Sequence, residues 1–422
     1  MTFGSSGSDR LRRGRIRRPG ISGLEPVWPA GQVRPAALRP PTLRQRLLSR
    51  DSPLRQLDWV LLLVVLALSL AGTLLVWSAT RPGLAATGAD PSTYLKKQIL
   101  NTAIGLVLMV AVGLLDTRQL QLFAPLVYLV SLLGLLAVLS PLGSTINGAH
   151  AWITLPAGYQ VEPSEFAKLG LILMIGVIFA RVRDGDRVPR PRDVGLVLAC
   201  AAPVLGLVVA EPALGVTIVL LLITVGMVAL SGMKLRWLAA LGGAGTLAVV
   251  AMLSMHVLQP YQVQRLTAFA NPSANPLGTG YSAAQAKIAI GSGGMFGQGL
   301  FHGQLVAGSF VPSQHTDFIF TVAGEELGFA GSIAIIALLA LLLLRALRIA
   351  AQADDQFGLL VASGVAIWFA VQSFINIGMT IGIMPVTGIP LPFVSYGGSA
   401  MFADMMAIGL LQSVHRRHYV FA

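Results

Sequence analysis

Cysteine and charged side chains are both scarce in this chain of 422 residues. The single cysteine, Cys200, lies in an apolar run, which excludes an intrachain disulfide and a metal cluster held by cysteines. Charged residues make up 11% of the chain, whereas an ordinary soluble protein carries about 25%. A mean hydropathy of +0.73 points the same way. The composition therefore excludes an ordinary soluble globular protein.

Long apolar runs take the place of the missing charges. Hydrophobic residues make up 55% of the chain. Runs of roughly 18 or more apolar residues recur, each long enough to cross a hydrocarbon core of about 30 Å. These runs predict an all-α polytopic membrane protein with about ten transmembrane helices. The expected spans are Trp59–Ala79, Ile99–Leu115, Leu122–Leu139, Phe166–Ala180, Val194–Ala210, Leu214–Leu230, Trp237–Val257, Phe318–Leu344, Phe357–Thr380 and Ala400–Ser413.

The basic residues predict how these helices are oriented. The chain has 30 Lys and Arg against 18 Asp and Glu, a formal net charge of +12. This excess lies at the amino terminus and in alternate loops, which is a pattern of membrane topology and not a nucleic-acid signature. Both termini are expected in the cytoplasm: residues 1–57 as a disordered basic tail rich in Arg, Pro and Gly, and residues 418–422 as a short end. Residues 258–316, between the seventh and eighth spans, then form a large extracytoplasmic loop.

Four polar residues mark this loop and its junction with the eighth span: Arg265, Lys287, His315 and Asp317. Lipid cannot satisfy such groups, so they must face water or a polar ligand. Asp317 has two interpretations. It could cap the helix that follows, or it could be a partly desolvated carboxylate whose raised basicity suits general-base catalysis. Arg265 and Lys287 could be interfacial snorkelling groups or could bind an anion.

Polar or ionisable residues also occur at membrane depth: Glu165, Lys168, Glu325, Asn376 and, in a segment broken by proline and glycine, Ser395. Glu165 and Lys168 lie three residues apart, so they could pair with each other or contact a ligand. A broken segment at this depth is tolerated only where it is buried in protein or lines an aqueous space. Taken alone, these features fit a transporter cavity as well as an enzyme.

Four motifs resemble those of a known family. In chain order they are IAIGSGGMFGQG, HTDFIFTVAGEELG, NIGMTIGIMPVTG and PLPFVSYGGS, and the resemblance runs from Leu57 to Arg417. The chain resembles the SEDS family (shape, elongation, division and sporulation), the group of RodA and FtsW. IAIGSGG and PVTGIPLPFVSYGGS are more similar to the RodA branch, and we expect an actinobacterial type.

The resemblance implies a peptidoglycan glycosyltransferase of the bacterial cytoplasmic membrane. Such an enzyme polymerises lipid II at the outer face of that membrane during cell elongation, with inversion at the anomeric carbon and undecaprenyl pyrophosphate as the leaving group. The implied partners are a class B penicillin-binding protein, which is a transpeptidase, and other proteins of the elongation or division complex. A divalent cation, magnesium or manganese, is implied at the pyrophosphate, without a readable set of metal ligands.

The resemblance also assigns roles to residues. It implies that Asp317 of HTDF is the catalytic carboxylate. The expected substrate-binding residues are Trp152, Glu165, Lys168, Arg265, Lys287, His315, Glu325, Asn376 and Ser395.

The chain departs from the family motifs at positions near these residues. Ala151 stands where Arg or Lys usually precedes the tryptophan, Glu162 and Glu211 replace glutamines, and Ala213 replaces an acidic residue. None of these departures removes Asp317. Two other functions stay open: a flippase or transporter of lipid-linked precursors, and a non-catalytic scaffold of the wall-synthesis complex. A flippase needs a polar path that reaches both faces of the membrane, whereas a polymerase needs an outward groove with a base.

Overall fold

In the computed structural model, the described residues are 56–146, 149–154, 159–180, 190–234, 236–240, 242, 243, 245, 263, 265, 269 and 279–421. The predicted tail, apart from its last two residues, lies outside them, as does most of the expected span Trp237–Val257. These described residues all belong to one compact unit, Pro53–Ala422.

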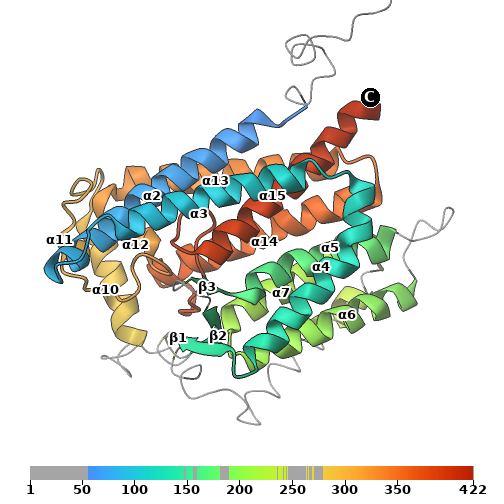
Figure 1. The fold of residues 1–422 in the computed structure, drawn as a ribbon, viewed down its shortest axis with the longest axis horizontal. Helices are drawn as coiled ribbons and strands as arrows, with labels where there is room; N and C mark the ends of the chain where they lie inside the picture. Colours follow the sequence, from blue (N-terminus) through green and yellow to red (C-terminus); the bar gives the residue numbers. More distant parts are fainter. Residues whose placement is uncertain are drawn as a thin grey trace, which may run out of the picture. The chain divides into compact units, whose positions relative to one another are not determined.

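Helices dominate the described part of the chain (Figure 1). They are α2 (Trp59–Ala86), α3 (Thr93–Gly113), α4 (Thr117–Val138), α5 (Pro163–Ala180), α6 (Pro191–Ala210), α7 (Leu214–Leu230), α10 (Thr279–Ser292), α11 (Gln304–Ala307), α12 (Ile319–Glu326), α13 (Gly328–Ala351), α14 (Gln356–Ile381) and α15 (Gly398–Phe421). Seven of these are long and apolar enough to cross a membrane, and α7 is a shorter apolar helix. The predicted polytopic α-helical class is confirmed, while the count of ten spans stays a prediction.

A small antiparallel sheet, which the sequence analysis did not predict, lies between α4 and α5. Its strands are β1 (Gly143–Ile146), β2 (Ala149–Thr154) and β3 (Gln160–Val161), in the order β1-β2-β3. Trp152 of β2 pairs with Ser144 of β1, whose hydroxyl donates to the Trp152 carbonyl at 3.1 Å. The sheet therefore fixes the backbone at Trp152, and its last strand, β3, leads into α5.

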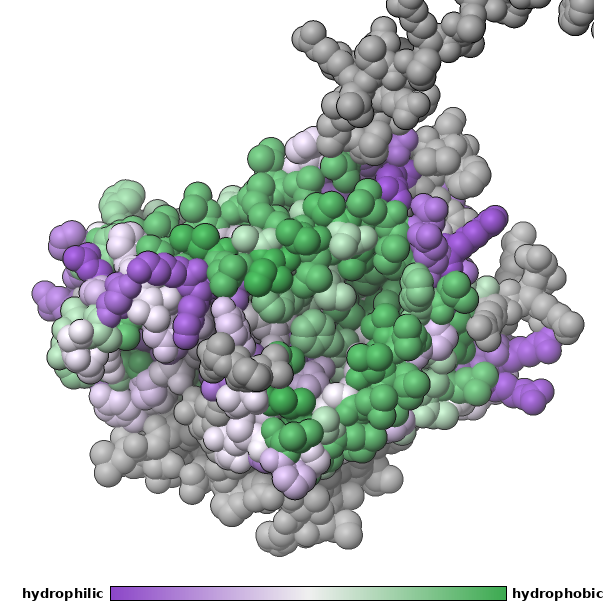
Figure 2. Space-filling model, viewed as in Figure 1, coloured by the Kyte–Doolittle hydropathy of each residue, from purple (hydrophilic) through white to green (hydrophobic). Residues whose placement is uncertain are grey.

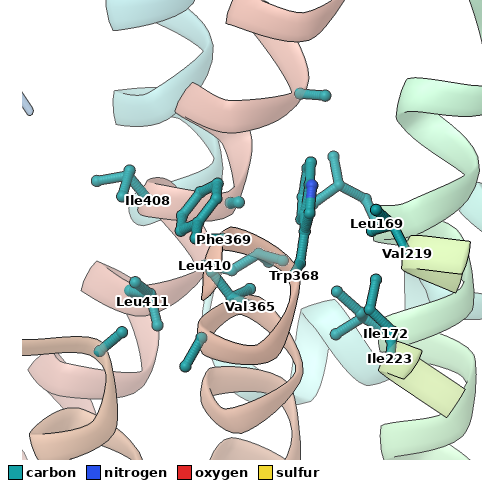
Figure 3. Close-up of a cluster of buried hydrophobic side chains, with 14 of the residues drawn as sticks. Leu169, Ile172, Val219, Ile223, Val365, Trp368, Phe369, Ile408, Leu410 and Leu411 are labelled. Atoms are coloured by element: carbon teal, nitrogen blue, oxygen red, sulfur yellow. The ribbon is translucent and has the colours of Figure 1, made fainter. Parts of the chain in front are cut away.

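Helices α5 and α14 form the buried centre of the bundle. Trp368 and Phe369 of α14 are fully buried, and their rings lie 5.2 Å apart. Figure 3 shows them among aliphatic side chains that α5, α7 and α15 contribute. These side chains are Leu169, Ile172, Val219, Ile223, Ile408, Leu410 and Leu411.

The outer helices turn apolar side chains outward. Leu63 and Leu70 of α2, Val107 of α3 and Leu122 of α4 are all more than 60% exposed. Figure 2 shows the result as a broad hydrophobic surface, with hydrophilic residues gathered toward its two ends. A soluble protein rarely exposes so large an apolar area, whereas lipid tails cover it without cost.

The expected eighth span is divided in two. The sequence predicted one helix from Phe318 to Leu344, but the structure ends α12 at Glu326 and starts α13 at Gly328, which has a positive φ of 68°. The cause is a tightly packed glycine loop after α10. Its Gln298 and Gly299 amides donate to the carbonyls of Glu325 and Glu326, both at 3.0 Å. A side chain on this loop would prevent so close an approach of two backbones.

Substituting Gly297 with alanine should therefore destabilise the fold, by about 1–3 kcal/mol. Gly297 has a φ of +82°, and an added Cβ would overlap the Glu326 carbonyl. Thermal unfolding of the purified protein in detergent measures the effect. Gly294→Ala is the matched control, since Gly294 also has a positive φ but has open space around its Cβ position. Equal losses of thermal stability in the two variants would show that the close packing of Gly297 against α12 does not contribute to the stability of the fold.

Candidate functional site

A cavity of about 470 Å³ lies where the sheet, the turn between α6 and α7, and the segments that precede α12 and α15 meet. Its walls are mixed in character. The aromatic and ionisable side chains that line it are Tyr94, Lys97, Trp152, Tyr159, Glu162, Arg265, His315, Asp317 and Tyr396. Four of the predicted site residues are thus brought together here: Trp152, Arg265, His315 and Asp317.

The turn that carries Asp317 is held by side chains from other elements. Asn376 of α14 donates to the Asp317 carbonyl and to the Ile389 carbonyl, each at 2.8 Å. The Ser395 hydroxyl donates to the Thr316 carbonyl at 2.6 Å and accepts from the Leu391 amide at 2.8 Å. Asn376 and Ser395 therefore position the walls of the cavity through backbone contacts.

The Asp317 carboxylate does not cap the helix that follows it. The N-cap of α12 is Phe318, and no side chain caps that described helix. The carboxylate instead lines the cavity beside Gly388, where an added Cβ would lie 3.3 Å from Asp317 Oδ2 and 3.3 Å from Arg265 Nη1. The acid and the guanidinium thus flank the same glycine, and the capping interpretation of Asp317 is wrong.

The surroundings of Asp317 tune its basicity. Burial raises the pKa of Asp317 to about 6, while the positive charge of Arg265 and a hydrogen bond with Thr316 lower it. Arg265 is fixed in turn, because its Nη1 donates to the Thr387 carbonyl at 3.0 Å. A carboxylate with a pKa just below neutrality is ionised at pH 7 and is a stronger base than an exposed aspartate.

An aromatic cluster forms another wall. The Tyr94 ring lies edge-on to His315 and to Tyr396, with centroids 5.1 and 4.9 Å away. The Tyr396 amide donates to the His315 carbonyl at 2.9 Å, which ties this wall to the turn that carries Asp317. Burial lowers the pKa of His315, so its imidazole is neutral at pH 7. Lys97 lies 6.0 Å from the centre of the Tyr94 ring and adds a cation to this side. Flat rings with a few polar groups suit a ligand that is part apolar and part charged.

Glu165 and Lys168 lie under the cavity and do not line it. Lys168 Nζ is 2.8 Å from Glu165 Oε2 and 2.8 Å from Gln372 Oε1, and both charged side chains are 1% exposed. The same ammonium group lies 4.5 Å from the centre of the Trp368 ring. The structure thus places the predicted pair in a buried network that links α5 to α14.

Two further predicted residues lie away from the cavity. Glu325 accepts hydrogen bonds from the Leu305 and Val306 amides at 2.7 and 3.1 Å, so it holds the short helix α11 against α12. Lys287 is exposed, and its side chain passes beside Gly382 at the end of α14, where a cation complements the helix dipole.

Sequence reasoning missed several residues of the cavity. Tyr94, Lys97, Asn101, Tyr159, Gln160, Glu162 and Ser399 line it without having been predicted as site residues. Lys97 follows Lys96 at the start of the second expected span, where a snorkelling cation is ordinary. Glu162 carried a signal, since it was already noted as a departure from the family motif.

The described residues offer no complete metal site. Within the ranges that the structure describes, no three His, Cys, Asp or Glu side chains are arranged to hold a metal ion. The predicted magnesium or manganese ion would have to take most of its ligands from water or from phosphate oxygens. Its ligands in this protein stay unassigned.

The fold and the cavity define the class of protein: a polytopic membrane protein with a buried acid, a guanidinium and an aromatic wall around one cavity. Residues 58–420 match the family model of FtsW, RodA and SpoVE, described as cell cycle protein. The chain belongs to this family.

Three similar proteins illustrate the match. The chain is 37% identical over 360 residues to the peptidoglycan glycosyltransferase MrdB of Escherichia coli K12, covering 85% of this chain and 93% of the relative. It is 35% identical over 369 residues to the probable peptidoglycan glycosyltransferase FtsW of Trichlorobacter lovleyi, covering 87% and 95%. A solved structure described as a peptidoglycan synthase complex that coordinates polymerization and crosslinking matches with a TM-score of 0.70 and 32% identity, covering 86% of this chain and 98% of that one.

Proposed function

We propose that this protein is a peptidoglycan glycosyltransferase that polymerises lipid II at the outer face of the bacterial cytoplasmic membrane during cell elongation. The observation that carries the proposal is the presence of Asp317 and Arg265 on either side of Gly388 in one cavity. Family membership and the names of the relatives support the same activity. Both termini then lie in the cytoplasm, and the cavity opens on the outer side.

In the proposed reaction, Asp317 acts as the general base. The C4 hydroxyl of the acceptor N-acetylglucosamine gives its proton to the Asp317 carboxylate as its oxygen attacks C1 of the donor N-acetylmuramic acid. The C1–oxygen bond to the lipid diphosphate breaks, and undecaprenyl pyrophosphate leaves with the bonding electrons. Attack opposite to the leaving group inverts the anomeric configuration. One bond forms, one breaks, and one proton moves to the carboxylate.

The cations of the cavity suit the leaving group. Arg265 and Lys97 both line the cavity, and each can offset negative charge on the departing diphosphate. Arg265 also lowers the pKa of Asp317, which keeps the base ionised at neutral pH. The aromatic rings of Tyr94 and Tyr396 would lie against the apolar faces of the sugars.

The similar solved structure also supports a protein partner. The similar peptidoglycan synthase complex couples polymerization with crosslinking, which is the reaction of a transpeptidase. We therefore expect this chain to work with a class B penicillin-binding protein and with other proteins of the elongation complex.

Arg265→Gln should lower the rate of lipid II polymerisation by about 10- to 100-fold, because it removes one cation from the leaving group. It should also raise the pKa of Asp317, so the acidic limb of the rate profile should move to higher pH. The assay uses the purified full chain, its transpeptidase partner and labelled lipid II, with glycan strands separated by gel. Arg348→Gln is the control, since Arg348 is exposed in the last turn of α13.

Lipid II translocation in proteoliposomes tests the alternative function. Movement of lipid II across the bilayer by the wild-type chain, with no glycan formed under any condition, would replace the proposed polymerase with a transporter.

A further inference from the structure

Glu162 is a cavity residue to which the reaction above gives no role. It directly precedes α5, and its amide donates to the Ser399 hydroxyl at 3.0 Å. Its Oε1 accepts from the Ser164 hydroxyl at 2.9 Å. The residue is half-buried and lines the cavity, so its side chain can reach a bound substrate. Backbone and side chain are therefore both anchored while one side of the carboxyl group faces the substrate space.

The charged and titratable groups around Glu162 come from several elements. They are Glu165 and Lys168 of α5, Glu211 after α6, Asp317 before α12, and the cavity residues Tyr94, Lys97, Tyr159, Arg265, His315 and Tyr396. The Lys168 ammonium group contacts Glu165 and Gln372. Within the described part of the chain, the ion pairs connect other residues, and none includes Glu162. The carboxyl group thus lies among acids without a cation of its own.

This environment favours the neutral form of Glu162. Burial raises the pKa of Glu162 to about 8, and the negative charges of Glu165 and Asp317 act in the same direction. The hydrogen bond from Ser164 and the charge of Lys168 oppose the shift without cancelling it. A protonated carboxyl group is a hydrogen-bond donor, whereas a carboxylate only accepts.

Glu211 adds a second, independent observation. It is fully buried, and neither of its carboxyl oxygens has a hydrogen-bond partner in the described structure. An ionised carboxylate without partners is very costly in such a place, so Glu211 is neutral as well. Burial, together with the negative charge that Glu162 would carry, raises the pKa of Glu211 to about 8. Glu162 and Glu211 are therefore close enough for a negative charge on Glu162 to raise the pKa of Glu211.

We propose that Glu162 is a protonated carboxylic acid at neutral pH and donates a hydrogen bond from the cavity wall to a phosphate oxygen of the lipid-linked donor. This inference rests on the proposed function, since it assigns a donor to the same substrate. Glu162 is then a contact that holds the diphosphate in place while Asp317 takes the proton of the acceptor. When Glu162 ionises, it loses its donor proton and repels the phosphate.

The test compares Glu162→Gln with the wild type across pH, using the full chain, its partner and lipid II. An amide donates a similar hydrogen bond but cannot ionise. Between pH 8 and 9.5 we expect the wild-type kcat/KM to fall about tenfold per unit, while that of Glu162→Gln stays level. At pH 7 the kcat/KM of Glu162→Gln should be about 2- to 5-fold lower than that of the wild type, because the amide is a weaker hydrogen-bond donor. Glu162→Ala should raise KM about 10-fold at every pH below 8.

A second readout does not depend on activity. The infrared band of a protonated carboxyl group should be present in the wild type at pH 6, should disappear on titration to pH 10, and should be diminished in Glu162→Gln. Identical alkaline limbs in the wild type and Glu162→Gln would overturn the proposal, and so would an infrared titration of Glu162 that is complete by pH 6. If neither protein makes glycan at pH 7, the proposed function fails, while the infrared titration still decides the protonation of Glu162.

Discussion

Asp317→Asn should reduce lipid II polymerisation by about 10²- to 10⁴-fold, the range that a general base contributes. The amide keeps the shape of the side chain but cannot accept the proton of the acceptor hydroxyl. The backbone anchors of the turn are independent of the carboxylate, since Asn376 and Ser395 bind carbonyl groups. The variant should therefore fold and bind its partner normally. Glycan yield from labelled lipid II is the measurement.

The pH dependence of the wild type provides an internal check on this assignment. The base must be ionised, and the pKa of Asp317 is raised to about 6. The rate should therefore rise between pH 5 and 7 and should follow the fraction of ionised Asp317. Asp90→Asn is the matched control, because the Asp90–Lys96 pair is exposed on both sides and such pairs contribute little. Full polymer yield from Asp317→Asn would remove Asp317 from the reaction.

Lys168→Met should destabilise the protein by about 3–5 kcal/mol, because it leaves the Glu165 carboxylate buried without its cation. Both side chains of the pair are 1% exposed, and the same substitution removes the hydrogen bond to Gln372. Thermal unfolding in detergent measures the loss. The double variant Glu165→Gln/Lys168→Met should recover most of it, since no unpaired charge remains.

This comparison also separates the two interpretations of Lys168 that the sequence left open. A structural pair predicts lost stability with normal turnover at temperatures where the variant stays folded. Normal melting with lost turnover would instead place Lys168 in contact with substrate.

The sequence predicted what depends on local composition. Apolar runs located the apolar helices α2 to α7, α13 and α14, because length and hydropathy are properties of one segment, whereas α10 and α11 fall inside the predicted loop 258–316. The same rule failed at Gly328, where the apolar run continues but a distant glycine loop hydrogen-bonds to the backbone and breaks the helix. Nothing in the run itself reveals that loop.

Part of the candidate site was also predictable, because some of its residues are unusual for the segment in which they lie. Asp317 stood out as an acid at the junction of a polar loop and an apolar run. Its role could not be chosen from sequence, because the choice between cap and base depends on Arg265 and on Gly388, which are far from it along the chain. Glu325 was expected in contact with substrate, yet its partners are two amides of the short helix α11.

The two hydrogen bonds of Asn376 have a mechanical consequence. The side-chain amide of Asn376, near the end of α14, holds both the turn of Asp317 and the irregular segment of Ile389, and both of these lie on the cavity wall. Because Asn376 belongs to α14, a small rotation of this helix would move both segments of the cavity wall together. The distance between these two segments would stay the same while the opening of the cavity widens or narrows around them.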